Sequence, residues 1–326
     1  MEIFLFKTTG ARINITDIVE SLSWSGSIEQ ASRILDITVI NAPFDPVMAQ
    51  VSRFLELGDF ISVEKENVEI FFGQVYTLEK SSDIGTVTYN CYDIVNHLLK
   101  SKGKYNFKDM TAEGIAARVC AELSIPAGNF ARTEVNIKTM IVDGTSIYDT
   151  IMQAYTKAYK VNHKMYQLVQ EKRAISVIEV GTKVANFRLS EESNITKTSQ
   201  SESINDMINR VKIYNEKGTQ IGEVSDSVAL KKFGAFQEVY TAEKGIQPTV
   251  GATSMLKGMT QNLSIEAVGD TRCVAGMGVE VYDITQGISG LYWISSDKHE
   301  FKESVHTMTL ELSFKRLMDI KEDQEA

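Results

Sequence analysis

The sequence contains few of the residues that mark specialised classes of protein. Its 326 residues include only four prolines, and aromatic residues make up 9%, which argues against a proline-rich linker protein and against an aromatic-lined glycan cleft. The three cysteines, Cys91, Cys120 and Cys273, are scattered, and each lies in an apolar run. An odd, scattered set of this kind predicts buried free thiols in a reducing cytoplasm.

Clustered positive charge is also lacking. The chain has 34 lysines and arginines against 43 acidic residues, a net charge of −9. No basic cluster is interleaved with aromatic residues, so we expect no stable nucleic-acid binding. No stretch reaches the ~20 apolar residues of a membrane-spanning helix, and the first residues, MEIFLFKTTG, lack the pattern of a signal peptide. We therefore expect no membrane insertion by the chain itself.

Known catalytic and ligand-binding motifs are missing or incomplete. Residues 276–278 (GMG) lack the third glycine of a dinucleotide loop. Residues 299–303 (HEFKE) have glutamate where a zinc-protease motif needs its second histidine, and His97, His163 and His306 have no partner at ligand spacing. The sequence thus predicts no catalytic, metal-binding or cofactor-binding residue, no cofactor, and a protein that is not an enzyme. Two acids that converge only in the fold, as in glycoside hydrolases, remain an alternative.

Two stretches far apart in the chain share one β-pattern. Residues 57–93 and 275–314 each contain three alternating apolar and polar runs separated by glycine, serine or charged turns, which is typical of an antiparallel meander with one buried face. We interpret them as copies of one β-module. The motifs taken as equivalent are Phe71-Phe72 with Tyr292-Trp293, and Val87-Thr88-Tyr89 with Met308-Thr309-Leu310; Tyr292 and Trp293 are candidates for barrel core or subunit interface.

The sequence between the meanders changes character. Apolar residues at helical spacing predict helices over 111–123 and from 147 onward, and a hairpin pattern follows at 163–180. The predicted fold is mixed and mainly β, with two similar antiparallel β-barrel domains and an α/β insert between them. The predicted boundaries are 1–100 for the first barrel, 101–182 for the insert, 183–317 for the second barrel with a short helical excursion near 226–261, and 318–326 for a disordered acidic tail.

Particular motifs in the first half are similar to a known family. They are Leu22-Ser23-Trp24-Ser25-Gly26, residues 33–40, Leu57-Gly58-Asp59, residues 70–73, Tyr92-Asp93, Tyr105-Asn106-Phe107, Thr111-Ala112-Glu113, and residues 143–149. In this order the chain resembles the XkdQ/YqbQ family of PBSX-type prophages, phages and contractile bacteriocins. That family is distantly similar to late-control D proteins and to the N-terminal part of VgrG.

The resemblance implies a structural function rather than catalysis. It implies a baseplate hub of a contractile phage tail or phage-tail-like particle, in which a homotrimer presents six similar barrels in a ring. Such a ring requires the two copies in one chain to superpose by a rotation near 60° about the trimer axis, and we predict that they do. The implied partners are the tail tube protein or tube initiator, the central spike protein and the baseplate wedge proteins. The implied location is the bacterial cytoplasm during assembly and then the baseplate of the released particle.

An alternative is a peptidoglycan hydrolase or glycan-binding protein delivered by such a particle. Residues 142–159 resemble the opening of the glycan-binding LysM module, although the rest of that module is absent. The glycan-binding version of this alternative therefore concerns the 101–182 insert.

Overall fold

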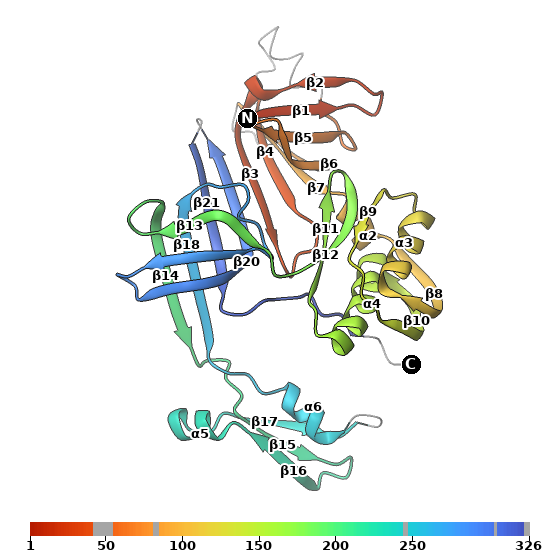
Figure 1. The fold of residues 1–326 in the computed structure, drawn as a ribbon, viewed down its shortest axis with the longest axis vertical. Coiled ribbons are helices and arrows are strands. Elements are labelled where there is room, and N and C mark those ends of the chain that lie inside the picture. The colour runs from red at the N-terminus through yellow and green to blue at the C-terminus, as the bar shows by residue number, and fades with distance from the viewer. Residues whose placement is uncertain (42–54, 81–84, 244–246, 303–304, 323–326) are drawn as a thin grey trace. The chain divides into compact units, whose positions relative to one another are not determined.

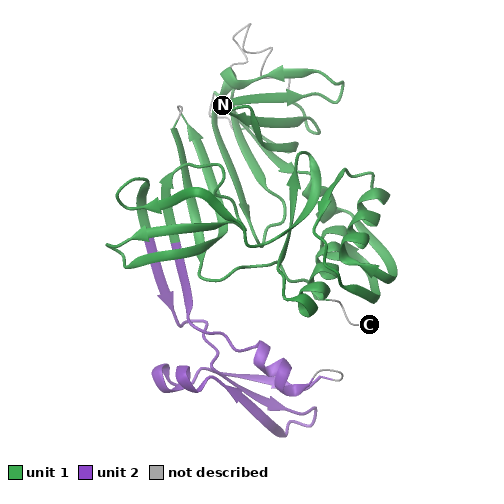
Figure 2. Cartoon of the chain, in the orientation of Figure 1, with its two compact units in different colours: residues 1–198, 264–326 green, residues 199–263 purple. Residues whose placement is uncertain are grey.

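The computed structural model describes residues 1–41, 55–80, 85–243, 247–302 and 305–322. These form two compact units, residues 1–198 with 264–326 and residues 199–263 (Figure 2). Strands predominate and most pair antiparallel (Figure 1), which confirms the predicted mainly β fold class. Closure of the sheets into barrels stays a prediction.

The first β-module, residues 1–93, is a sheet with the strand order β3-β4-β7-β6-β5-β1-β2. Alternation builds it, because every second residue of a strand faces the core: Leu35, Ile37 and Val39 of one strand are buried, and their neighbours are partly exposed. Its elements are β1 (Glu2–Phe6), β2 (Arg12–Asn14), η1 (Thr16–Ile18), β3 (Val19–Ser27), β4 (Ile34–Ile40), β5 (Phe60–Lys65), β6 (Val68–Lys80) and β7 (Thr86–Asp93).

The second β-module, residues 183–203 with 260–313, has the strand order β14-β18-β21-β20-β19-β13. Its β18 buries Leu263, Ile265 and Ala267 in alternation, as β4 does in the first module. The elements are β13 (Lys183–Ser190), β14 (Ile195–Ser203), β18 (Thr260–Val268), β19 (Gly278–Asp283), β20 (Ile288–Lys302) and β21 (Val305–Ser313).

The two modules have matching strand orders. Reading β3, β4, β7, β6, β5 and β1 against β14, β18, β21, β20, β19 and β13 gives the same sequence of neighbours in the sheet. One difference is the outer strand, since β1 runs antiparallel to β5 whereas β13 runs parallel to β19. The topology supports the predicted duplication of one module; superposition by a rotation near 60° stays a prediction.

The backbone register of the two meanders also agrees. The pairing of β6 with β7 shifts between Val75 and Thr77, and that of β20 with β21 shifts between Ile294 and Ser296, so each long strand carries a bulge at the same place. Counting from the bulge, Val87-Thr88-Tyr89 and Met308-Thr309-Leu310 are equivalent, as predicted. The aromatic pairs are not, because Tyr292-Trp293 align with Gly73-Gln74, two residues beyond Phe71-Phe72.

A tight turn precedes the bulge in both copies. Gly58 has φ +91° and Gly276 has φ +92°, a region that costs little only for glycine. The amide of Gly58 donates to the carbonyl of Val75 at 2.9 Å, and the amide of Gly276 donates to the carbonyl of Ile294 at the same distance. The two copies therefore share a backbone frame even where their side chains differ.

The insert lies between the modules in sequence and has its own core. Thr111 caps its first long helix through the amide of Gly114, and Ser146 caps the second through the amide of Asp149, as N-cap hydroxyls do. The predicted helices and hairpin are all present; the strand β8, which is rich in lysine, was not among the predicted elements. The elements are α2 (Val95–Lys100), β8 (Lys102–Thr111), α3 (Ala112–Glu122), β9 (Ala127–Phe130), β10 (Asn136–Ser146), α4 (Ile147–Asn162), β11 (Tyr166–Glu171) and β12 (Ala174–Glu179).

The predicted disorder of the 318–326 tail is wrong for residues 318–322. Met318 packs against the insert core, Asp319 accepts a hydrogen bond from the Tyr148 hydroxyl at 2.8 Å, and the amide of Lys321 donates to Thr156 at 3.2 Å. The segment is held by polar contacts to α4, which its low apolar content did not reveal. Residues 323–326 lie outside the described residues.

The helical excursion is larger than predicted. The smaller compact unit, 199–263, contains a three-stranded sheet in which β15 pairs antiparallel with β16 and parallel with β17. Val211, Ile213 and Ala252 form its small core. Residues 207–214, which the predicted boundaries assign to the second barrel (183–317), therefore belong to this unit and not to the second β-module. The elements inside it are β15 (Arg210–Tyr214), β16 (Gln220–Ser225), α5 (Ser227–Phe233), β17 (Gln237–Thr241) and α6 (Pro248–Ser254).

Candidate functional site

The β3–β20 pairing joins the two modules into one sheet. Residues 21–27 of β3 pair antiparallel with residues 296–302 of β20, from Ser27 opposite Ser296 to Ser21 opposite Lys302. Figure 1 shows the two strands side by side. We call this pairing and the side chains packed along it the seam.

A buried ion pair crosses the seam. Both terminal nitrogens of Arg33 donate to the carboxylate of Asp297, one of them at 3.0 Å to Oδ1, and Oδ1 also accepts the amide of Ala275 at 2.7 Å. Asp297 is 3% exposed, and the guanidinium carbon of Arg33 lies 4.1 Å from the centre of the Trp24 ring. Because a buried carboxylate is stable only when its oxygens are paired, this geometry fixes residue 33 of one module against residue 297 of the other.

Two histidines continue the network away from the ion pair. His299 Nδ1 lies 3.0 Å from Nε2 of His306, and His299 Nε2 lies 3.0 Å from the carbonyl oxygen of Cys273. Lys65 Nζ lies 3.3 Å from Nδ1 of His306. Burial, the neighbouring His299 and Lys65 lower the pKa of His306 to about 4, and burial lowers the pKa of His299. Both rings are therefore neutral near pH 7, which suits a structural hydrogen-bond chain.

A cavity of about 550 Å³ opens at one end of the seam. Phe301 contributes to its lining and stacks on His306 with ring centres 4.0 Å apart. The lining mixes apolar side chains with lysines and hydroxyls, namely Met1, Ile3, Thr16, Val19, Glu20, Ser21, Leu22, Lys65, Phe301, Lys302, Val305 and His306. Its residues come from both modules, so the cavity is a feature of the joint.

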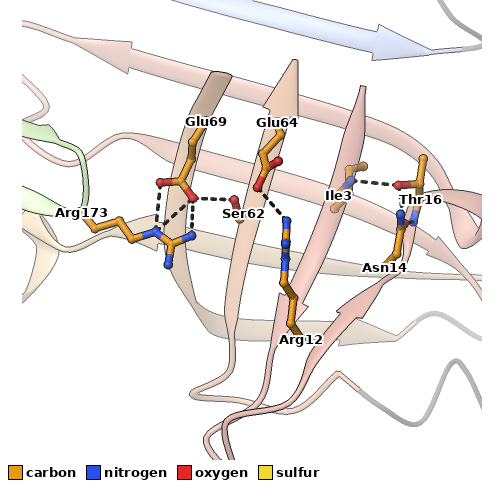
Figure 3. A network of polar contacts seen from close by, with 8 residues as sticks. All are labelled: Ile3, Arg12, Asn14, Thr16, Ser62, Glu64, Glu69 and Arg173. Atoms are coloured by element: carbon orange, nitrogen blue, oxygen red, sulfur yellow. Dashed lines mark hydrogen bonds and ion pairs between the residues drawn. The ribbon is translucent and has the colours of Figure 1, made fainter. Parts of the chain in front are cut away.

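The insert is tied to the first module by the turn of its β11–β12 hairpin. Arg173 donates from Nε and Nη2 to Glu69 of β6 at 2.6–3.1 Å, and Glu69 also accepts the hydroxyl of Ser62 at 2.6 Å (Figure 3). The guanidinium carbon lies 4.1 Å from the centre of the Phe72 ring. On the neighbouring strands of the same sheet, Arg12 donates to Glu64 at 3.0 Å (Figure 3). The modules and the insert are thus held by charge pairs at separate places.

The structure places the motifs that sequence analysis weighed and set aside. Residues 299–303 begin in β20 and not on a helix, which is the wrong element for a zinc-protease motif. Gly276 forms the turn before β19. Tyr292 and Trp293 are 8% and 7% exposed and pack within the chain, Tyr292 on Phe314 with ring centres 5.2 Å apart.

Sequence analysis did not predict the network of the seam. His306 was judged to lack partners, but strand pairing brings it against His299 across the β20–β21 hairpin. Arg33 and Asp297 are 264 residues apart in the chain, so no spacing rule links them. The available signal was a charged residue at a core-facing position of β20, Asp297, and another directly before β4, Arg33.

A metal site or a membrane-spanning helix would each point to another function. Within residues 1–41, 55–80, 85–243, 247–302 and 305–322, no group of three or more histidine, cysteine or acidic side chains is arranged to hold a metal ion. In the same ranges, no helix has the length and apolar content needed to cross a membrane.

Comparisons with known proteins give consistent relatives. A model of the YQBQ-like family matches residues 22–313. The phage-like element PBSX protein XkdQ of Bacillus subtilis (strain 168) is 29% identical over 98% of both chains.

Solved structures share the fold at low identity. The 43 kDa tail protein of prophage MuSo2 from Shewanella oneidensis aligns with a TM-score of 0.70 at 14% identity, over 96% of this chain and 98% of that one. The E. coli c3393 protein, a component of the type VI secretion system, aligns with a TM-score of 0.54 at 9% identity, over 95% of this chain and 76% of that one. Identities this low speak for the fold alone.

Proposed function

The chain belongs to the YQBQ-like family, and we propose that it is a structural protein of the baseplate of a contractile phage tail or phage-tail-like particle. In this role it is the hub, a homotrimer that joins the sixfold tail tube to the threefold central spike and contacts the baseplate wedge proteins. The relatives that support this proposal are XkdQ of the phage-like element PBSX and the prophage MuSo2 tail protein.

The observation that carries the proposal is the duplicated module. Two copies with the same strand order, the same bulge and the same glycine turn stand side by side in one sheet, joined through β3 and β20. Three such chains around an axis present six similar modules, and a cyclic arrangement of this kind satisfies both a sixfold and a threefold neighbour. The protein assembles in the bacterial cytoplasm and is then carried in the released particle.

The arrangement of the seam favours a structural function over catalysis. Its buried side chains are committed to one another: Asp297 to Arg33 and the amide of Ala275, and His299 to His306 and a carbonyl oxygen. Groups held in this way stabilise a joint and do not offer a free nucleophile or base to a substrate.

The copy number in the particle tests the proposal. Purified particles from the organism that encodes this chain should contain three copies per baseplate, counted by quantitative mass spectrometry against the spike and tube proteins. One copy per baseplate contradicts the hub. A cell-wall zymogram of the full chain should stay blank; a cleared band would support the hydrolase alternative instead.

A further inference from the structure

The two sides of β20 have different partners. On one side β21 follows it from Trp293 to Lys302. On the other side β19 pairs with it up to Trp293, and beyond the bulge β3 takes over from Ser296 to Lys302. The second half of β20 therefore pairs with β3 at the seam. We call this side of β20 an acceptor edge, and the side of β3 that pairs with it a donor edge.

The first module has an equivalent acceptor edge, with which no strand of the described residues pairs. β7 follows β6 on one side from Gly73 to Lys80, and β5 pairs with the other side only up to Gln74. Beyond the bulge, residues 77–80 have no strand on that second side in the described part of the chain. Their side chains are exposed, Leu78 by 38%. Counting from the bulge, Leu78 is the equivalent of Asp297.

The second module has the matching donor, also without a partner. β14 stands beside β18 as β3 stands beside β4, but among the described strands it has no neighbour on its other side. Its sequence, ITKTSQSES, has no proline, and an open edge of this kind offers unpaired N–H and C=O groups to another strand. Its exposed edge is thus a donor of the same kind as β3.

The register of the missing pair follows from bonds within the chain. Leu263 of β18 is equivalent to Leu35 of β4, because Gly269 donates to the carbonyl of His306 and sets β18 against β21 in the register that β4 has against β7. The ion pair of Lys197 with Glu266 and the bond of Asn262 to Ser201 set β14 against β18. These steps make residue 202 the equivalent of Gly26, which pairs with Asp297.

We propose that β14 of one copy pairs antiparallel with residues 77–80 of β6 in a second copy of this chain, with Glu202 opposite Leu78. The inference rests on the proposed hub function and names the surface through which its copies meet. Each copy then has one donor edge and one acceptor edge, a head-to-tail contact that forms a ring when the rotation closes. Since the contact repeats the β3–β20 seam, every step between modules is alike, and three copies with six modules close the ring.

The seam between copies differs chemically from the seam within the chain. Leu78 and Gln261 stand where Asp297 and Arg33 form the buried ion pair, so the proposed contact lacks that pair. Backbone hydrogen bonds hold it instead, and the charged side chains along it are Glu202 of β14 with Glu79 and Lys80 of β6.

Disulfide trapping tests the pairing with the full chain. The double variant Leu78→Cys with Glu202→Cys places two thiols opposite each other. The Cβ atoms of opposite residues are nearly as close as those of a disulfide, so a small shift allows the bond to form. After mild oxidation we expect dithiothreitol-sensitive dimers and trimers on a non-reducing gel. The native cysteines at 91, 120 and 273 are buried and do not compete.

The matched control shifts the register by one residue. Glu79→Cys with Glu202→Cys puts the thiols on opposite faces of the sheet, so its yield of linked species should be at least fivefold lower, and each single variant should give dimers at most. Equal yields from the two double variants overturn the proposed pairing. The copy number in particles is measured separately. Three copies per baseplate together with equal yields would contradict the strand pairing but not the hub function. Selective linking together with another copy number would contradict the hub function.

A charge at the acceptor edge gives a second readout that needs no cysteine. Leu78→Lys should reduce the incorporation of the chain into particles at least several-fold. The control Leu291→Lys makes the same change at a residue of β20 that is 46% exposed and already pairs with Glu280 of β19, and it should incorporate normally. Equal incorporation of the two variants contradicts the proposal.

Discussion

The first and second β-modules share a backbone frame and differ in how their edges are used. Both have the same strand order, a bulge at Tyr76 or Ser295, and a glycine with φ near +90° before it. In the first module, β3 is buried in the seam, whereas its equivalent β14 stands at an edge. The six residues that connect β3 to β4 are replaced in the second module by the 204–259 excursion.

The difference teaches which features the duplicated fold depends on. The bulge and the glycine turn recur although the side chains around them have changed, because both are backbone features that set where one neighbouring strand ends and the next begins. The buried ion pair occurs at the internal seam alone among the described equivalents. The shared backbone features and the ion pair of the seam are therefore independent, and a substitution can disturb one without the other.

The largest effect is expected from loss of the ion pair between Arg33 and Asp297. Asp297→Ala should lower the free energy of unfolding by about 3–5 kcal/mol, because it removes the buried carboxylate that pairs with the partly buried Arg33 and accepts the buried amide of Ala275. Tryptophan fluorescence in a urea titration measures it, since Trp24 and Trp293 both lie in the larger unit.

The control for this variant is an ion pair within the second module. Glu280 pairs with Lys183 at 2.6 Å, and both side chains are about half exposed, so Glu280→Ala should cost far less than Asp297→Ala. The double variant Arg33→Met with Asp297→Leu should regain most of the loss, as apolar replacements of buried pairs do. An Asp297→Ala cost no greater than that of Glu280→Ala would show that the pair does not hold the seam.

The stability of the seam and that of the first module depend on pH in opposite directions. The pKa of His306 is lowered from 6.5 to about 4, so the stability it supports is present above pH 6.5 and is lost as pH falls toward 4. Burial raises the pKa of Asp93 from 3.8 to about 6, so its contribution is present below pH 3.8 and is lost as pH rises through 6. The two contributions oppose each other between pH 4 and 6.

Single variants should uncover each contribution. His306→Gln should make the chain up to about 3 kcal/mol less sensitive to acid, and Asp93→Asn should make it more sensitive by a similar amount. Urea midpoints from pH 4 to 7.5 measure both slopes. Parallel shifts of the two variants, instead of opposite ones, would contradict the assignment.

The smallest effect is expected at the shared turn. Gly58→Ala should cost about 1–2 kcal/mol because of its positive φ, as Gly10→Ala should at φ +91° with no atom within 4 Å of the added Cβ. Gly276→Ala should cost more, since its Cβ meets Gln167 Oε1 at 1.9 Å and the side chain must move. Thermal unfolding measures the stability of the three variants. A larger loss of stability for Gly58→Ala than for Gly276→Ala would contradict this prediction.

The sequence predicted the elements better than their partners. The helices α3 and α4 could be predicted because capping residues and helical spacing are local, and the meanders because alternation is local. Residues 210–214 fell within the predicted second barrel but belong to another sheet, since alternation shows that a strand has one buried face but not which sheet it joins. β8 was missed because lysines on its exposed face masked the pattern.

By itself the sequence determined the mainly β composition, the order of the parts and the presence of two similar modules, because these follow from periodicity and from residues near one another in the chain. Only the tertiary structure decided the register of the copies, the seam and its network of Arg33, Asp297, His299 and His306. The physical reason is that strand pairing joins residues 264 positions apart through backbone groups that every residue carries, so the sequence does not show which strands meet or which edges stay open.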